Sequence, residues 1–295
     1  PNNLGILAEF DGDNFKVVER SQFTDITTKN GIYAIPNDDS PLWAIGWDAK
    51  SVRLKVMDKG EWHTYLLPKA TYNNDPPHGW FTEWPRIRSI GNGRMMMDMH
   101  GMFYDFPETF SASNTAGIKP IGSHLRYIPD FMHWNDKIVL ATDETSIQGN
   151  PLAGQPQSNL WFGSYEQLSE WGPASGYGAV WLKEVVAANQ PSGPYLMAGF
   201  DNRTLHLKNH GESTVTVTLE IDKTGDNSWE TYQSVKLSSG MYKHHIFDKA
   251  LEAQWIRLKT DRSSELTATF HFTDDNLNDG SERTSLFSTL ADIDY

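Results

Sequence analysis

The hydrophobic and polar positions in the first half of the chain recur in a fixed order of turn, basic residue and alternating apolar strand. The pattern occurs three times, with turn residues Asp48, Asn92 and Asn135 that lie 44 and 43 positions apart (92−48 and 135−92). The apolar strands that follow these turns span residues 52–56, 95–97 and 138–140. A period of about 40–50 residues made of short strands is typical of β-propeller blades. We therefore expect residues 1–190 to form blades.

Each copy is followed by an aromatic strand, at residues 62–68, 102–107 and 160–165. The third is delayed by residues 145–158, which are rich in Gly, Pro, Gln and Asn and predict a loop. Residues 6–11 are similar to this aromatic strand, as if from an earlier blade, and residues 285–290, within 277–295, look like the start of another. Either the two ends pair to complete one blade, or further blades come from a longer chain or a second copy. We favour the second interpretation, because closed propellers usually have about four to eight blades.

The period changes in residues 191–276. Residues 213–221 alternate strictly between apolar and polar, as a half-buried strand does. Further short strands are predicted near residues 230–237, 242–247, 254–259 and 266–272, separated by polar turns. Regularly spaced short strands of this kind predict an antiparallel β-sandwich. The chain is thus expected to be all-β, with a sandwich that either binds sugar or, as we favour, buttresses the propeller.

The composition of the chain argues against several classes of function. The 295 residues carry a formal charge of −13, which disfavours nucleic acid because phosphates require a basic surface. No apolar run approaches the roughly 20 residues of a membrane helix, so no membrane span is expected. The absence of cysteine excludes disulfides, thiolate metal sites and cysteine nucleophiles. Because the sequence starts at Pro1 without a signal peptide, we expect a mature or trimmed product.

Aromatic residues make up 12% of the chain and include 11 Trp. These rings either pack between sheets or line a sugar-binding surface, where the C–H faces of pyranose rings stack on them. In a propeller, the blade-to-blade loops and the turns between the second and third strands open on one face of the central channel. Mapping the repeat onto this rule predicts catalytic roles for His100, His124, Glu83 and Asp143, and substrate-binding roles for Arg86, Arg126, Tyr127, His78, Trp80 and Trp84.

These residue types suit sugar chemistry. A carboxylic acid or imidazole protonates the leaving oxygen, and a carboxylate or tyrosine acts as base or nucleophile. Glu83 lies between aromatic residues, where burial would raise its pKa toward that of a general acid. Arginine holds a uronate or sulfate through paired hydrogen bonds. The structural alternatives are that His100 only terminates a strand and that Asp143 lies in a solvated turn.

No metal site is predicted, since the histidines lack a tight ligand spacing such as H-x-x-x-H. Residues 11–14 and 222–227 are acidic turns that could hold calcium through oxygen ligands, although ordinary Asx turns explain both. The chain lacks a G-x-x-x-x-G-K loop, a G-x-S-x-G elbow and an H-E-x-x-H helix.

The blade repeat with aromatic third strands, followed by a sandwich, resembles bacterial propeller proteins that act on polysaccharides, namely sialidase-like glycosidases and propeller-type lyases. The resemblance implies a periplasmic or secreted carbohydrate-active enzyme that cleaves a polysaccharide or oligosaccharide, with hydrolysis favoured over elimination. The sequence departs from the sialidase pattern, because it has no S-x-D-x-G-x-T-W box. The alternatives are a non-catalytic glycan-binding protein with exposed tryptophan platforms and a protein-interaction scaffold with a flat apolar face.

Overall fold

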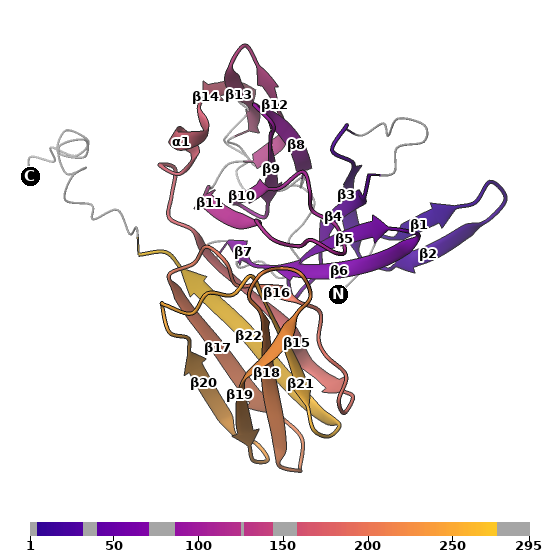
Figure 1. Cartoon of the computed structure of the whole chain (residues 1–295), viewed down its shortest axis with the longest axis vertical. Helices are drawn as coiled ribbons and strands as arrows, with labels where there is room; N and C mark the ends of the chain where they lie inside the picture. Colours follow the sequence, from indigo (N-terminus) through magenta and orange to yellow (C-terminus); the bar gives the residue numbers. More distant parts are fainter. Residues whose placement is uncertain (1–4, 32–39, 71–85, 125–126, 144–157, 276–295) are drawn as a thin grey trace, which may run out of the picture.

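The computed structural model describes residues 5–31, 40–70, 86–124, 127–143 and 158–275 and shows a chain built almost entirely of β-strands (Figure 1). A single short helix, α1 (Tyr165–Leu168), lies among the described residues. The strands form a β-sandwich, drawn in the lower half of Figure 1, and a set of smaller antiparallel sheets above it. None of the helices in the described part is long and apolar enough to cross a membrane.

The repeat folds into three antiparallel meanders. The first meander comprises β3 (Gln22–Thr27), β4 (Leu42–Trp47), β5 (Val52–Asp58) and β6 (Glu61–Leu67). The second comprises β8 (Arg86–Gly91), β9 (Arg94–Met99), β10 (Met102–Phe106) and β11 (Lys119–Ser123). The third comprises β12 (Tyr127–Trp134), β13 (Lys137–Asp143) and β14 (Ser158–Gly163). The predicted apolar strands are therefore the middle strands β5, β9 and β13, and the predicted aromatic strands are β6, β10 and β14.

The turns before two of the middle strands explain why these positions recur in the sequence. Asn92 (φ 54°) and Gly93 (φ 70°) form the β8–β9 turn, and Asn135 (φ 51°) and Asp136 (φ 59°) form the β12–β13 turn. All four are in the left-handed region, which Gly and Asn adopt more readily than other residues and which matches the twist of a hairpin. The predicted turns at these positions are confirmed.

The sandwich packs two sheets face to face. One sheet orders its strands as β20 (Tyr242–Ile246), β17 (Asn202–Asn209), β22 (Ser264–Thr273), β15 (Ser175–Val186) and β7 (Lys69–Ala70). The facing sheet contains β19 (Trp229–Leu237), β18 (Val215–Asp222), β21 (Trp255–Thr260) and β16 (Tyr195–Leu196). Strands β17 and β22 alternate between buried and partly exposed positions along most of their length, as expected when one face of a sheet forms the core.

The first meander is fused to both sheets of the sandwich at Pro68. Strand β6 pairs in parallel with β16, so the facing sheet becomes one continuous sheet of eight strands that includes the first meander. Two residues later, β7 pairs with β15 in the other sheet. Proline has no N–H to donate to a strand ladder, so the chain leaves one sheet at Pro68 and enters the other. Tyr104 of the second meander donates a hydrogen bond to the Pro68 carbonyl (3.0 Å) at this crossing.

The meanders stack against one another through alternate positions of their middle strands. In β9, Met95 and Met97 join the core shared with the first meander and the sandwich, while Met96 faces the third meander. In β13, Ile138 and Leu140 pack on the second meander in the same small core as Met96. Alternate positions of β9 therefore face the preceding and the following sheet, and alternate positions of β13 face the preceding one.

The meanders do not close into a ring within the described residues, and the further blades expected from a longer chain or a second copy stay a prediction. Residues 6–11 contain β1 (Leu7–Phe10), which pairs with the next strand, β2 (Phe15–Glu19), as a hairpin. Their assignment to an earlier blade stays a prediction. One expectation is corrected. The predicted boundary at residue 190 is too late, since β15 pairs with β22 inside the sandwich. The predicted loop at 145–158, apart from its last residue, and the predicted strand at 285–290 lie outside the described residues.

The β1–β2 hairpin is attached to the first meander by charged side chains. Glu19 accepts hydrogen bonds from Arg53 and from Lys55 (2.7 Å to the latter), both on β5. Glu9 accepts a hydrogen bond from the indole N–H of Trp62 (2.7 Å). Burial raises the pKa of Glu19, but the hydrogen bonds and charges of Arg53 and Lys55 outweigh this effect and hold the pKa below its ordinary value of 4.5.

We expect Gly176→Ala to reduce the free energy of unfolding by about 1–3 kcal/mol, because it forces atoms into a packed backbone crossing. A Cβ at this position would lie 2.5 Å from Pro68 Cβ and 3.1 Å from the Lys69 carbonyl oxygen. Denaturant unfolding measures the change. Gly193→Ala is the matched control, since its Cβ would meet only the flexible Leu66 side chain, at 3.3 Å. Equal stability of the two variants would contradict this account of the crossing.

We expect Glu19→Gln to lower stability by about 1–3 kcal/mol near neutral pH, since the hydrogen bonds from Arg53 and Lys55 lose a charged acceptor. A carboxylate with a lowered folded pKa stabilises the fold fully above its unfolded pKa, near 4.5, and loses this contribution as the pH falls through the folded value. The stability difference between wild type and variant should therefore shrink below about pH 4.5. Urea unfolding across the acid range tests this, with exposed Glu230→Gln as a control that should change little.

Candidate functional site

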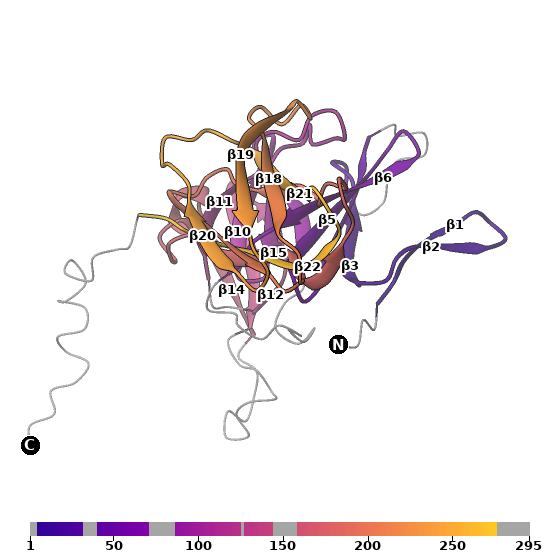
Figure 2. The ribbon, with the colours of Figure 1, turned by 90° about the horizontal axis from the view of Figure 1, so that it is seen from below.

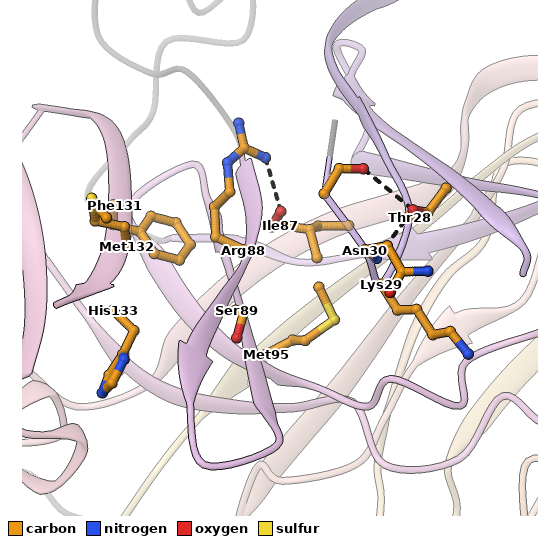
Figure 3. Close-up of a pocket in the computed structure, with 11 residues that line it drawn as sticks. Thr28, Lys29, Asn30, Ile87, Arg88, Ser89, Met95, Phe131, Met132 and His133 are labelled. Atoms are coloured by element: carbon orange, nitrogen blue, oxygen red, sulfur yellow. Dashed lines mark hydrogen bonds between the residues drawn. The ribbon is translucent and has the colours of Figure 1, made fainter. Parts of the chain in front are cut away.

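A pocket of about 370 Å³ lies where the innermost strands of the three meanders meet (Figure 3). One wall is the turn after β3, the opposite wall is the end of β12, and strands β8 and β9 lie between them. Its apolar lining is provided by Ile87, Met95 and Phe131, which are buried, and by exposed Met132. The polar lining residues are Thr28, Lys29, Asn30, Arg88, Ser89 and His133. The pocket thus combines an apolar floor with a polar rim, which is typical of small-molecule sites.

The turn after β3 is held closed by its own backbone. Thr28 and Gly31 exchange two hydrogen bonds between their N–H and carbonyl groups (3.1 and 3.0 Å). The Thr28 hydroxyl accepts a further hydrogen bond from the Asn30 N–H (3.1 Å), and Gly31 supplies the left-handed φ of 104° that the turn needs. Lys29 and Asn30 therefore lie at the tip of a fixed turn, exposed at the edge of the pocket.

Arg88 connects the three meanders through an ion-pair network that is buried at Asp25 and half-exposed at Asp130. Its Nη1 donates to Asp25 Oδ2 of β3 (2.7 Å), and its Nε lies 3.2 Å from Asp130 Oδ1 of β12. Asp25 also accepts the Ile87 backbone N–H (3.0 Å), so its buried carboxylate has two donors. Arg86, two residues earlier on β8, donates to the Thr24 carbonyl (2.8 Å) and lies 3.7 Å from Asp130. Two arginines and two aspartates from three sheets form this polar seam beside the pocket.

The members of the seam differ in access to solvent, and this determines which of them can meet a ligand. The Asp25 side chain is 5% exposed and that of Arg88 is 14% exposed, whereas the Asp130 side chain is 49% exposed. Buried charges cost desolvation energy and are retained only when they are well paired. Asp25 and Arg88 therefore hold the strands in place, while Asp130 is the solvent-exposed carboxylate of the seam and precedes Phe131 of the pocket lining.

The histidine of β12 closes one end of the pocket. The ring of His133 packs over Gly91, where an added Cβ would lie 2.4 Å from His133 Cδ2. Its Nε2 is buried and has no hydrogen-bond partner among the described residues. A glycine is required at position 91 for two reasons, the room for this ring and its left-handed φ of 85°.

The two predicted catalytic histidines lie together at the opposite end of the second meander. His124 donates its backbone N–H to the Gly101 carbonyl (2.8 Å), next to His100 in the β9–β10 turn. The side chain of His124 is 1% exposed, its Nε2 lies 2.8 Å from Asp98 Oδ1, and its ring stacks on Phe103. His100 is fully buried with its ring edge-on to Trp47. Both imidazoles are therefore packed inside the described structure rather than lining its pocket.

Three further predicted residues lie at the same end of the meanders as these histidines. Arg86 starts β8 and is paired in register with Asp98, the partner of His124. Tyr127 starts β12 and is paired in register with Asp143 at the end of β13. The propeller rule thus selected residues that lie together at one end of the meanders in the structure. Their catalytic and binding roles remain predictions. The other predicted site residues lie outside the described part of the chain, namely His78, Trp80, Glu83, Trp84 and Arg126.

Sequence reasoning missed the pocket and, apart from Arg86, the members of the polar seam. Charged residues inside strands were the available signal, namely Asp25 between Thr24 and Ile26 in β3 and Arg88 next to Ile87 in β8. A charge at such a position requires a partner. The partner could not be identified, because Asp25, Arg88 and Asp130 are separated by more than forty residues of chain from one another.

The acidic turns use their carboxylates on their own backbone. Asp11 Oδ1 accepts the N–H groups of Asp13 and Asn14 (2.9 and 2.7 Å). Asp222 accepts the backbone N–H groups of three residues of its turn, at 2.8–3.2 Å. These are the Asx-type contacts predicted as the alternative to calcium binding. Within the described ranges, no cluster of three or more His, Asp or Glu side chains could hold a metal ion.

Comparisons with known proteins do not assign the chain to a family. No protein-family model and no curated protein matches it. Among solved structures, the PBSX exported protein XepA matches 33% of this chain and 36% of its own length at 10% identity and a TM-score of 0.26. A GH32 β-fructofuranosidase from Bombyx mori matches 89% and 68% at 10% identity and a TM-score of 0.28. An exo-β-1,3-galactanase from Phanerochaete chrysosporium matches 81% and 67% at 9% identity and a TM-score of 0.23. Matches this loose establish neither a fold nor an activity.

We expect Arg88→Met to destabilise the protein by about 3–5 kcal/mol, because it leaves the buried Asp25 carboxylate without its guanidinium. The double variant Arg88→Met, Asp25→Asn should recover part of this loss, since the neutral amide costs less to bury. Thermal and denaturant unfolding measure both. Lys223→Met removes one member of an exposed pair and serves as the control, with little expected change. A loss no larger than that of the control would contradict the structural role of the seam.

Proposed function

We propose that the protein is carbohydrate-active and that the pocket between the three meanders binds one unit of a glycan. The observation that supports this proposal is the juxtaposition of an apolar floor with a rim of hydrogen-bonding groups beside the arginine–aspartate seam. Sugar rings present apolar C–H faces and hydroxyl groups at once, so they need both kinds of surface. Lys29 at the rim makes no ion pair within the described residues and favours a glycan with uronate or sulfate groups.

The reaction that we assign to this site is hydrolysis of a glycosidic bond. Asp130 is the accessible carboxylate of the seam, and Arg86 and Arg88 hold it from one side. It would act as the base or nucleophile of the reaction. Protonation of the leaving oxygen requires a second group, and the sequence predicts Glu83 in that role, outside the described residues.

A non-catalytic glycan-binding protein is the second candidate. It is favoured by the pairing of both seam carboxylates with arginine: Asp25 is bonded to Arg88, and Asp130 lies within ion-pair distance of Arg86 and Arg88. Among the described residues, this leaves no carboxyl group beside the pocket that lacks a basic partner and could serve as a proton donor. The two candidates share the binding site and differ in whether a product is released.

A screen against neutral, uronate-containing and sulfated polysaccharides tests the proposal. We expect reducing ends to appear without the absorbance of unsaturated uronates, and Asp130→Asn to lower the rate about 100-fold or more while binding is retained. The matched control is Asp136→Asn, on the neighbouring turn, where Asn also tolerates the left-handed backbone.

The alternative outcomes are distinct. Reducing ends together with the absorbance would identify a lyase and overturn hydrolysis. Retardation in affinity electrophoresis without any product would identify a glycan-binding protein. Absence of both product and retardation across the panel would refute the carbohydrate proposal.

A further inference from the structure

The sandwich carries a buried arginine at one end of its core. Figure 2 shows the sandwich from below, with β18, β19 and β21 in one sheet and β20 and β22 in the other. Arg203 lies on β17, which pairs with β20 and β22. Alternation along β17 places Arg203 on the same inner face as Leu205 and Leu207. Arg203 is 3% exposed, so its charge is almost completely removed from solvent.

No carboxylate of the described residues lies within ion-pair distance of this guanidinium. Its Nη2 donates to the carbonyls of Asp248, Lys249 and Leu251 at 2.8–3.4 Å. Its Nε is buried and has no hydrogen-bond partner within the same part of the chain. Burial lowers the pKa of Arg203 below its ordinary value of 12.5, and the charges of Asp201 and Asp248 offset only part of this effect. The side chain stays charged, but its charge is not neutralised.

Other arginines with little exposure are paired with acids. Arg53 is bonded to Glu19, and Arg88 is bonded to Asp25. Buried charges cost desolvation energy and are retained when a partner compensates them. The three carbonyl contacts of Arg203 explain how residues 248–251 are held against β17, but carbonyl groups carry no net charge. The missing negative charge is therefore expected from outside the described chain.

A pocket of about 410 Å³ lies beside this arginine. Arg203 lines it together with apolar Phe200 and Leu251. Lys223 and Lys249 also line the pocket, and both are exposed. Its size and its combination of apolar and charged groups are typical of sites for small molecules.

The two lysines are available to a ligand. Lys223 pairs with Glu230 at 2.6 Å and Lys249 with Asp275 at 2.5 Å, and all four side chains are more than half exposed. Exposed ion pairs of this kind contribute little free energy, so a ligand can replace the acidic partner at little cost.

Two carboxylates line the pocket as well. Asp201 is exposed and accepts the backbone N–H of Asp275 (2.9 Å), and Glu252 is exposed. Together with the three basic side chains, they give the lining a formal charge of +1 (3−2). The chain as a whole carries −13, so this pocket is a positive region on an acidic protein. An anion is attracted to it more than to the surrounding surface.

We infer that this pocket binds a small ligand through an oxyanion, either a carboxylate or a sulfate, that neutralises Arg203. A guanidinium suits such a group because its N–H donors match the spacing of two anion oxygens. Lys223 and Lys249 add positive charge at the entrance, and Phe200 and Leu251 offer apolar surface to the rest of the ligand. The pocket shares no lining residue with the one between the meanders, so the inference does not rest on the function proposed there. It makes the sandwich a binding module as well as a support.

Isothermal titration calorimetry with sodium glucuronate, sodium sulfate and glucose tests the site, with ionic strength held constant by sodium chloride. We expect saturable binding of glucuronate or sulfate and none of glucose. Glucuronate binding tighter than sulfate would identify the acidic group of a sugar as the ligand, and sulfate binding alone would identify a free anion. Arg203→Gln should weaken binding about 10-fold or more, because it removes the charged donor.

A second variant keeps the test valid if Arg203→Gln does not fold, which circular dichroism and thermal unfolding would show. Lys249→Met changes an exposed side chain and should weaken anion binding about 3-fold, since it removes one charge at the entrance. The matched control is Lys243→Met, an exposed lysine of β20 outside the pocket lining, which should bind like wild type.

The contrary outcomes are specific. Absence of saturable binding of both anions by wild type would overturn the inference, and so would unchanged affinity in folded Arg203→Gln or in Lys249→Met. Glucose binding as tight as that of glucuronate would overturn recognition through an oxyanion. Lys29→Met separates the two pockets: anion binding that this variant loses and Arg203→Gln retains would place the anion between the meanders and overturn the site in the sandwich. The reverse result would support the sandwich site and leave the proposed function to its own test.

Discussion

The structure depends on the crossing of the chain between two sheets at Pro68. Strand β6 extends one sheet of the sandwich through its parallel contact with β16, and β7 joins the other sheet through β15. The crossing is closely packed at two points: Gly176 leaves room for the proline ring, and the Tyr104 hydroxyl donates a hydrogen bond to the Pro68 carbonyl. Because the first meander is continuous with the sandwich, its orientation is fixed, and the second and third meanders stack from that base.

The stacking of meanders determines where the polar seam can form. Apolar side chains of β9 and β13 fill the spaces between neighbouring sheets, and the innermost strands β3, β8 and β12 are brought together at one edge of the stack. Arg88 lies at their meeting point and bonds to the strand on either side. A buried guanidinium is costly unless it is paired, so the seam fixes how the three innermost strands are aligned as well as shaping the pocket.

The candidate site could be predicted only in part. The repeat, combined with the propeller rule, predicted that Arg86, His100 and His124 lie close together. These residues do lie at one end of the second meander. The rule could not show that both imidazoles are buried, because burial depends on Trp47 and Phe103 from other strands. It also directed attention away from the pocket, which lies at the end where β3 and β12 finish.

The sequence by itself determined the strands, the left-handed turns at Asn92 and Asn135, the repeat of about 44 residues and the alternating strands of the sandwich. These features are local, since they follow from backbone preferences and from the period of apolar positions. The tertiary structure alone decided that β15 belongs to the sandwich and that Asp25, Arg88 and Asp130 meet. Those outcomes join residues far apart in the chain, and a local pattern carries no information on which distant strand will supply a partner.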